Sequence, residues 1–254
     1  MYQQFPGGKS YLYSKIAPTG FNMFKSPSII TTNLALDINP ANYPGSGTTI
    51  TDSSGNGRTF TFAGTPLPTY VATPVKSFSF IRNSAFGTYN RLELNSIFLG
   101  DDMTIQAWIN TSNVGQDTWH YLLMTIMAAE VGGPGNDWGF GINNSGKLAF
   151  GAGTSDTTIA STSSVNTGTW TNVAATRVKS SGLITLYING ASNGSGTGNA
   201  GNSLTSSTKV WIGSGQDGGY SFGGLIGEVI AYTSALSATD IQTNYNKTRS
   251  VYGV

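Results

Sequence analysis

Carboxylates at short spacing are the residues of this sequence that could carry hydrolytic chemistry, because glycoside hydrolysis requires a pair of them. The chain has three glutamates, Glu93, Glu130 and Glu228, and none lies two or four residues from another acid. The adjacent Asp101 and Asp102 would point to opposite faces of a strand. The linear spacing therefore offers no hydrolase pair, and we expect the protein not to be an enzyme.

Two glycine-framed motifs lack the structural context that their chemistry needs. Residues 219–223 match G-x-S-x-G, but a strand is predicted after them, whereas a nucleophile elbow leads into a helix. Residues 196–201 match G-x-G-x-x-G, yet no amphipathic helix follows to present its N-terminus to a phosphate. We interpret this second motif as a glycine-rich loop.

Metal ligands are restricted by composition. The chain has no cysteine and a single histidine, His120, which disfavours a transition-metal site. Calcium needs only oxygen ligands, so a calcium site stays open.

Strand counting predicts where the polar loops gather. If the strands from residue 103 onward alternate in direction, successive loops alternate between two ends of the fold. One end then collects the loops at 131–137, 153–156, 179–182 and 214–223. The other end collects the loops at 111–119, 144–146, 162–169 and 190–206.

The first of these ends is the predicted ligand site. Its acidic side chains are candidate calcium ligands: Glu130, Asp137, Asp156 and Asp217. Aromatic rings beside polar loop residues are how β-sandwich lectins hold sugars, by stacking and hydrogen bonding. The candidate glycan-binding residues are Trp119, Trp138, Tyr220, Asn136 and Gln216.

The elements that must position these residues are predicted to be strands. From residue 28 onward, hydrophobic residues follow a period of two, with turn signals at short intervals, which is typical of a sandwich or barrel. Strands are predicted at 29–38, 58–63, 75–81, 89–94, 103–110, 120–130, 138–143, 147–152, 157–161, 170–178, 183–189, 209–213 and 225–232. One helix is predicted near the end of the chain, where Ser237 and Asp240 form a capping box.

Low charge excludes several kinds of partner. Only 10% of the residues are charged and the net charge is +1, whereas a soluble domain usually has roughly 25% charged residues. Without a basic excess, nucleic-acid binding is not expected. No apolar run is long enough for a membrane span.

Residues 1–32 differ from the rest and are predicted to be an extended arm preceding a domain at 33–254. The arm is rich in aromatic residues, and three alternatives are open: it lies on its own domain, it docks on a neighbouring subunit, or it is disordered, which its aromatic content disfavours. Its candidate docking residues are Tyr2, Phe5, Tyr11, Tyr13, Phe21 and Phe24. The first residues lack the basic-then-apolar pattern of a secretory signal.

Several spaced motifs carry a resemblance to a known family. The chain resembles the laminin G-like (LamG-like) jelly roll of the concanavalin A-like lectin/glucanase superfamily. The stretches that carry it are MTIQAWIN at 103–110, NTGTWTNVAATR at 166–177, LITLYING at 183–190, WIGSG at 211–215 and FGGLIGEVIAYTSALSATDIQTNYN at 222–246. Residues 33–57 contain D-x-S-G-N-G, an element frequent in virus-encoded members.

The resemblance implies an all-β fold: an antiparallel β-sandwich of the concanavalin A-like jelly-roll type, with one short C-terminal helix. It implies, together with the arm, a structural protein of a virus particle (a capsid, decoration or surface subunit), assembled in the host cytoplasm. Other virion subunits, contacted through the arm, and host glycans are the expected partners. The alternative is a carbohydrate-binding adhesion module without a shell role. A glycoside hydrolase is the least favoured reading, because the acid set of the glucanases is missing.

Overall fold

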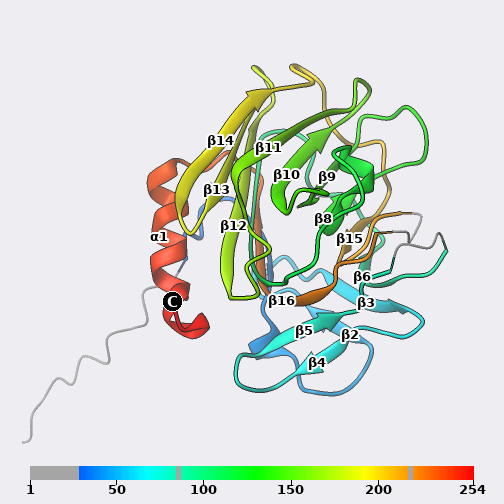
Figure 1. Cartoon of the computed structure of the whole chain (residues 1–254), viewed down its shortest axis with the longest axis vertical. Helices are drawn as coiled ribbons and strands as arrows, with labels where there is room; N and C mark the ends of the chain where they lie inside the picture. Colours follow the sequence, from blue (N-terminus) through cyan, green and yellow to red (C-terminus); the bar gives the residue numbers. More distant parts are fainter. Residues whose placement is uncertain (1–28, 84–86, 217–219) are drawn as a thin grey trace, which may run out of the picture.

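The computed structural model describes residues 29–83, 87–216 and 220–254, and these form two antiparallel sheets packed face to face (Figure 1). The first sheet has the order β14-β13-β12-β7-β16-β5-β4, with β1 also paired to β16. The second has the order β11-β10-β9-β8-β15-β6-β3-β2. The predicted β-sandwich is confirmed, whereas the predicted arm lies almost entirely outside the described residues.

The strands of the first sheet are β1 (Leu34–Ile38), β4 (Thr69–Val71), β5 (Ser77–Phe80), β7 (Met103–Asn110), β12 (Thr171–Val178), β13 (Leu183–Ile188), β14 (Ala191–Thr197) and β16 (Gly224–Tyr232). Those of the second are β2 (Thr49–Thr51), β3 (Thr59–Gly64), β6 (Asn90–Leu94), β8 (Met124–Ala129), β9 (Trp138–Ile142), β10 (Lys147–Ala152), β11 (Thr157–Ser164) and β15 (Val210–Ile212). The sequence prediction missed β2, β4 and β14, which are short or rich in Gly, Ser and Thr, and so lack an apolar alternation.

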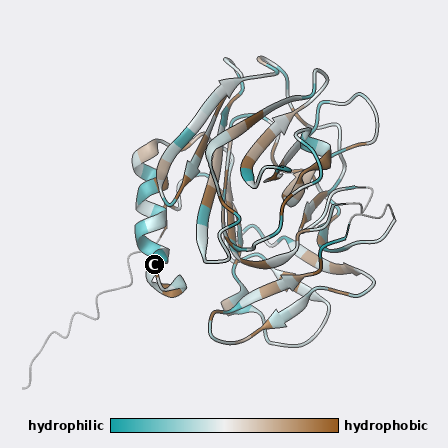
Figure 2. Ribbon diagram, viewed as in Figure 1, coloured by the Kyte–Doolittle hydropathy of each residue, from teal (hydrophilic) through white to brown (hydrophobic). Residues whose placement is uncertain are grey.

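The core lies between the sheets and is built by strict alternation along the strands. In β9, Trp138, Phe140 and Ile142 are buried in the core, and Gly139 and Gly141 alternate with them on the outer face. Figure 2 shows the same alternation of hydrophobic and hydrophilic residues along other strands. Because successive side chains point to opposite faces, the outer face of β9 carries almost no side-chain bulk.

The predicted helix is confirmed as α1 (Ala238–Thr248), whose capping box joins Ser237 and Asp240. It covers the outer face of the first sheet, where Ile241 packs on Ala174 and Tyr187. A 3-10 turn, η3 (Arg249–Tyr252), continues it. Among the described residues, no helix has the length and apolar character needed to cross a bilayer.

The D-x-S-G-N-G element is a structural clamp on β1. The Asp52 carboxylate accepts hydrogen bonds from the backbone N–H of Asp37 (2.7 Å) and of Ser54 (2.8 Å). The Asn56 amide donates to the carbonyls of Leu34 and Ala35 at 3.1 and 3.2 Å. The loop therefore supplies hydrogen-bond partners to backbone groups of the edge strand β1. This structural role accounts for the motif without a bound ligand.

Arg177 fixes the loop between β14 and β15. Its guanidinium is fully buried and donates to four carbonyls, those of Gly100, Asp101, Asn199 and Asn202, at 2.8–3.2 Å. Burial lowers the pKa of Arg177, and the nearby charges of the aspartates at 101 and 102 oppose that shift. One side chain therefore holds three segments of the chain together.

We predict that Arg177→Met lowers the free energy of unfolding by about 3–5 kcal/mol, because it removes four hydrogen bonds to carbonyls, of which only those of Gly100 and Asn199 also accept from a backbone N–H. Urea denaturation measures this loss. The matched control is Lys179→Met, two residues on, whose half-exposed ammonium pairs with Asp101 at 3.1 Å. That exposed pair should contribute less than about 1 kcal/mol. Equal losses in the two variants would contradict the role assigned to Arg177.

Two carboxyl groups, the buried Glu228 and the partly buried Asp37, lie near each other between β1 and β16. Burial raises the pKa of Glu228 to about 7, with a further contribution from the charge of Asp37, while a hydrogen bond from Asn39 (2.8 Å) opposes it. Burial and the charge of Asp52 raise the pKa of Asp37 to about 6. The folded protein therefore holds protons that the unfolded chain releases at lower pH.

This difference in proton binding predicts that stability falls as pH rises from about 5 to 8, by about 2–3 kcal/mol for Glu228 alone. Stability falls and does not rise with pH because the raised pKa makes the folded state bind more protons than the unfolded state in this pH range. Glu228→Gln should flatten the dependence, measured as free energy of unfolding against pH. Glu93→Gln is the control: burial acts to raise the pKa of Glu93, but its hydrogen bonds with Lys209 and Trp211 and its ion pair with Arg91 together lower it. A variant at Glu228 that keeps the wild-type slope would contradict this assignment.

Candidate functional site

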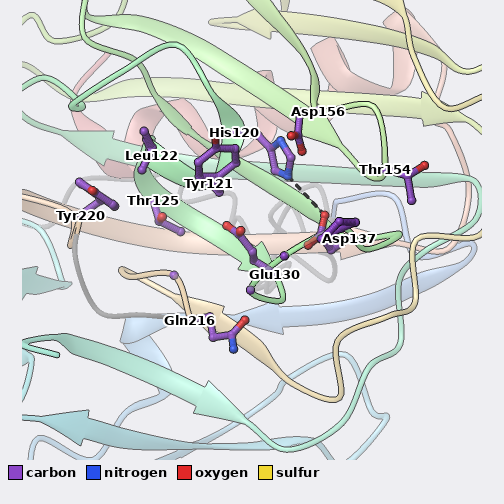
Figure 3. Close-up of a pocket in the computed structure, with 14 residues that line it drawn as sticks. His120, Tyr121, Leu122, Thr125, Glu130, Asp137, Thr154, Asp156, Gln216 and Tyr220 are labelled. Atoms are coloured by element: carbon purple, nitrogen blue, oxygen red, sulfur yellow. Dashed lines mark hydrogen bonds and ion pairs between the residues drawn. The ribbon is translucent and has the colours of Figure 1, made fainter. Parts of the chain in front are cut away.

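A cavity of about 410 Å³ lies on the outer side of the second sheet. Its walls come from the 3-10 turn η2 (His120–Leu122), the β8–β9 loop, the β10–β11 loop and the segment around Tyr220 (Figure 3). The lining includes glycine, aromatic, amide and carboxylate groups, a mixture suited to a polar ligand. Two of these walls, the β8–β9 and β10–β11 loops, belong to the first group of loops from strand counting, whereas η2 lies on the outer side of β9 and β10.

Two carboxylates meet at the base of this cavity because of strand register. Ala129 pairs with Trp138 on β8 and β9, so the next residues, Glu130 and Asp137, stand opposite each other at the end of the ladder. Since Ala129 and Trp138 face the core, the next pair faces outward. Strand counting had grouped Glu130 and Asp137 at one end of the fold, whereas the search for acids two or four residues apart did not cover this pair, because the hairpin joins residues seven positions apart.

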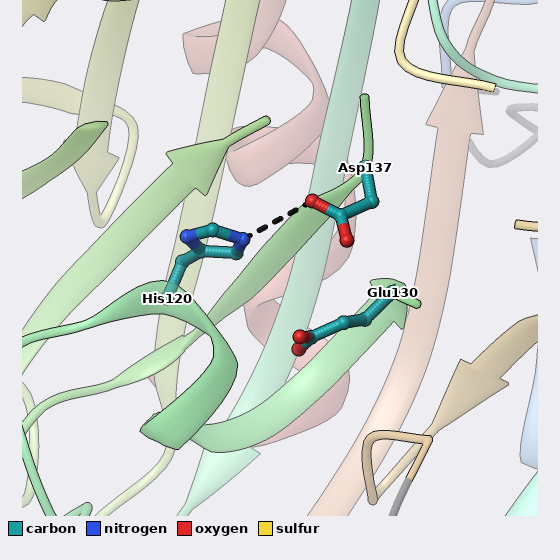
Figure 4. A group of neighbouring side chains, drawn as sticks. All are labelled: His120, Glu130 and Asp137. Carbon is teal, nitrogen blue, oxygen red and sulfur yellow. Dashed lines mark hydrogen bonds and ion pairs between the residues drawn. The ribbon is translucent and has the colours of Figure 1, made fainter. Parts of the chain in front are cut away.

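His120 completes this cluster (Figure 4). Its Nε2 lies 3.3 Å from Asp137 Oδ1, and Asp137 Oδ2 accepts a hydrogen bond from the backbone N–H of Val131 at 3.0 Å. The ligand atoms of His120, Glu130 and Asp137 all lie within 4.8 Å of one another. The side chains of His120 and Asp137 are only 1% and 4% exposed.

The sequence prediction placed His120 in a strand, and this was wrong. The strand begins at Met124, and His120 belongs to η2, which crosses the outer face of β9 and β10. Glycines make room for it: a Cβ at Gly151 would collide with the His120 side chain, and one at Gly139 would lie 2.8 Å from the His120 carbonyl. The alternation of glycine with large residues in β9 was the available signal.

Trp138 was predicted to bind a glycan, and the structure corrects this. Its side chain is 0% exposed and stacks on Phe150 in the core, with ring centroids 6.2 Å apart. Successive side chains of a strand point to opposite faces, so Trp138 faces the core while the adjacent Asp137 and Gly139 face outward. A sugar cannot reach this indole.

Trp119 and Tyr121 supply the exposed aromatic surface instead. They are 45% and 39% exposed and stack on each other, with ring centroids 6.4 Å apart and an interplanar angle of 15°. Tyr121, which sequence reasoning missed, lines the cavity. Partial burial raises the pKa of Tyr121, and the charges of Asp156, Asp117 and Glu130 raise it further.

Of the remaining predicted residues, Gln216, Asp156 and Tyr220 line the cavity. Tyr220 is largely buried and has a φ of 121°, an unusual conformation for a residue with a side chain. Asn136 is not among the residues that line the cavity, and its backbone N–H donates a hydrogen bond to Ser206 Oγ at 2.8 Å. Asp217 lies outside the described residues.

The loop after β14 is at the cavity end and not at the opposite end predicted for residues 190–206. Ser206 contacts Asn136 through two hydrogen bonds, and Asn199 contacts Thr154. The unpredicted strand β14 reverses the chain once more, which moves this loop to the other end.

An antiparallel sandwich with a polar, aromatic-edged cavity on the outer side of one sheet defines a lectin-like β-sandwich. A family model described as the concanavalin A-like lectin/glucanases superfamily, of the laminin G type, matches residues 83–242. This match covers more than half of the 254 residues, and the chain belongs to that superfamily. No curated protein sequence matches the chain.

Solved structures with the same fold include binding domains of botulinum neurotoxins. The binding domain of botulinum neurotoxin DC in complex with SialylT is 15% identical with a TM-score of 0.63, and covers 87% of this chain and 52% of that chain. The binding domain of serotype C1 is 18% identical with a TM-score of 0.59, covering 85% and 52%. The chain thus spans about half the length of these domains, and the likeness concerns the fold.

Proposed function

We propose that this protein is a carbohydrate-binding module and that its sugar site is the cavity beside Tyr121. The observation that carries this proposal is the joint placement of an exposed aromatic pair and polar groups around one hollow. Aromatic faces stack on the apolar faces of sugar rings, and amide and carboxylate groups accept or donate hydrogen bonds to their hydroxyls. A neurotoxin binding domain of the same fold has been solved with SialylT, which supports a role in glycan recognition.

The charge of the cavity favours neutral sugars. Glu130, Asp137 and Asp156 line it. An anionic sugar brought into such a site would be repelled at short range. We therefore expect a neutral glycan to be preferred over its sialylated counterpart.

Binding accounts for the cavity better than hydrolysis does. A retaining glycosidase keeps its two carboxyl groups about 5–5.5 Å apart and open to the substrate. Glu130 and Asp137 are close enough, but Asp137 is buried and its two oxygens already contact Val131 N–H and His120 Nε2. Its carboxylate is engaged by the protein, so it is poorly placed to attack a sugar.

We predict that Tyr121→Ala weakens glycan binding by roughly 3- to 10-fold, because one stacking contact is worth about 0.5–1.5 kcal/mol beyond its buried area. A glycan array identifies the ligand, and calorimetry on wild type and variant measures the affinity. Ile81→Ala, at another exposed apolar residue, is the control and should leave affinity unchanged.

The wild-type protein must bind at least one neutral glycan at millimolar concentration for the proposal to stand. Binding that survives Tyr121→Ala unchanged would move the site elsewhere. Release of free sugar from a bound glycan over hours would replace the binding role with hydrolysis.

We propose, as a second and compatible role, that the protein is a subunit of a virus particle assembled through residues 1–27. Its support is the aromatic, acid-free composition of that segment and the similarity of residues 33–57 to virus-encoded relatives. The low charge of the chain also weakens repulsion between copies packed side by side.

Deleting residues 1–27 is predicted to abolish assembly while leaving glycan affinity intact, because the described residues that line the cavity all lie between His120 and Tyr220. Light scattering and electron microscopy of the two proteins measure assembly. A deletion variant that assembles like wild type, or a wild type that is monomeric under all conditions, would remove the subunit role.

A further inference from the structure

We propose that His120, Glu130 and Asp137 bind one divalent transition-metal ion of the zinc type at the base of the cavity. Their three ligand atoms lie within 4.8 Å of one another and come from three separate places: η2, the end of β8 and the start of β9. Figure 4 shows the imidazole and both carboxylates converging on one point. This goes beyond glycan recognition, and it includes a histidine that sequence reasoning had set aside.

The distances fit a metal better than a hydrogen bond. A tetrahedral zinc ion with bonds of about 2.0–2.2 Å holds its ligand atoms about 3.3–3.6 Å apart. His120 Nε2 and Asp137 Oδ1 are 3.3 Å apart, which is long for a hydrogen bond and within reach of that tetrahedron edge. Glu130 needs only a small side-chain adjustment to complete the set.

The histidine is buried with one ring nitrogen facing the carboxylates. Its side chain is 1% exposed, and its Nε2 lies 3.3 Å from Asp137 Oδ1. Nδ1 has no hydrogen-bond partner among the described residues, and it is not a proposed ligand atom. The proposal depends on Nε2, whose position beside the carboxylates is the one that a metal-binding imidazole requires.

The backbone is also adapted to this ring. Glycine at 139 and 151 admits η2 onto the sheet, and a Cβ at either position would collide with His120 or crowd its backbone. The opposed pair of Glu130 and Asp137 adds a second argument, because like charges directly across a strand ladder repel each other. A bound cation would turn that repulsion into attraction.

The donor set selects the metal. One imidazole nitrogen and two carboxylates suit zinc or manganese, whereas calcium takes six to eight oxygen ligands. Three protein ligands leave at least one position open toward the cavity, for water or for a sugar hydroxyl. The calcium site predicted from Glu130, Asp137, Asp156 and Asp217 stays a prediction, and the experiment below distinguishes it from the mixed nitrogen and oxygen site proposed here.

The test uses full-length protein without a histidine tag, treated with a chelator, to which Zn²⁺, Mn²⁺ or Ca²⁺ is added separately and without sugar. Zn²⁺ is expected to bind at one ion per chain by calorimetry and to raise the melting temperature, and Ca²⁺ to do neither in the same concentration range. His120 is the only histidine, so its imidazole NMR signal reports the site directly and should shift on adding Zn²⁺.

Glu130→Gln is the main variant, because Glu130 is only partly buried and its loss should leave the fold intact. We expect it to weaken zinc binding at least about tenfold, while Asp101→Asn, at a largely exposed carboxylate, changes nothing. His120→Asn should abolish the visible absorption of a cobalt-substituted sample, provided that its circular dichroism matches wild type.

An unshifted imidazole signal, zinc binding that Glu130→Gln does not weaken, or binding of Ca²⁺ alone would each overturn the proposal. Because no sugar is present, these results are separate from the test of glycan binding. A protein that binds glycans without zinc would keep the proposed function and lose only the metal site.

Discussion

The alternation of large residues and glycine along β9 and β10 is the constraint on which the site depends. Trp138, Phe140 and Phe150 fill the core, and the residues between them must then face outward. Glycine at those outward positions leaves room for η2 to lie directly on the sheet. If they carried side chains, His120 could not reach the carboxylates, and the wall of the cavity formed by η2 would stand away from the sheet.

The same strand pair also sets the electrostatics. Register on β8 and β9 places Glu130 opposite Asp137, and the β10–β11 loop adds Asp156 at the cavity wall. In a chain with so few charges, three acids around one hollow dominate its local field. That field disfavours anionic ligands, and it makes a cation and a neutral sugar compatible occupants of one cavity.

Much of the fold was predictable, because most of its strands and its helix show a recognisable local sequence pattern. Period-two strands and the Ser237–Asp240 capping box identified most elements of the sandwich and its helix. The site was only partly predictable. Loop counting predicted that Glu130, Asp137 and Gln216 lie at one end. The direction of the Trp138 side chain was not predictable, because it depends on which face of its strand packs against the other sheet. His120 depends on glycines distant in sequence, and β14 had no apolar alternation to reveal it.

The outer faces of the two sheets differ in how far they are covered, and this difference supports the cavity as the proposed binding site. The outer face of the first sheet is closed: α1 packs on it, and Tyr252 of η3 stacks on Trp108 with centroids 4.3 Å apart. Polar groups beneath that cover are bonded internally, as Trp108 Nε1 is to Thr248. On the second sheet, among the described residues, η2 lies on the outer side of β9 and β10, and the cavity opens beside it. The proposed ligand would meet polar side chains there, whereas α1 and η3 cover those of the first sheet.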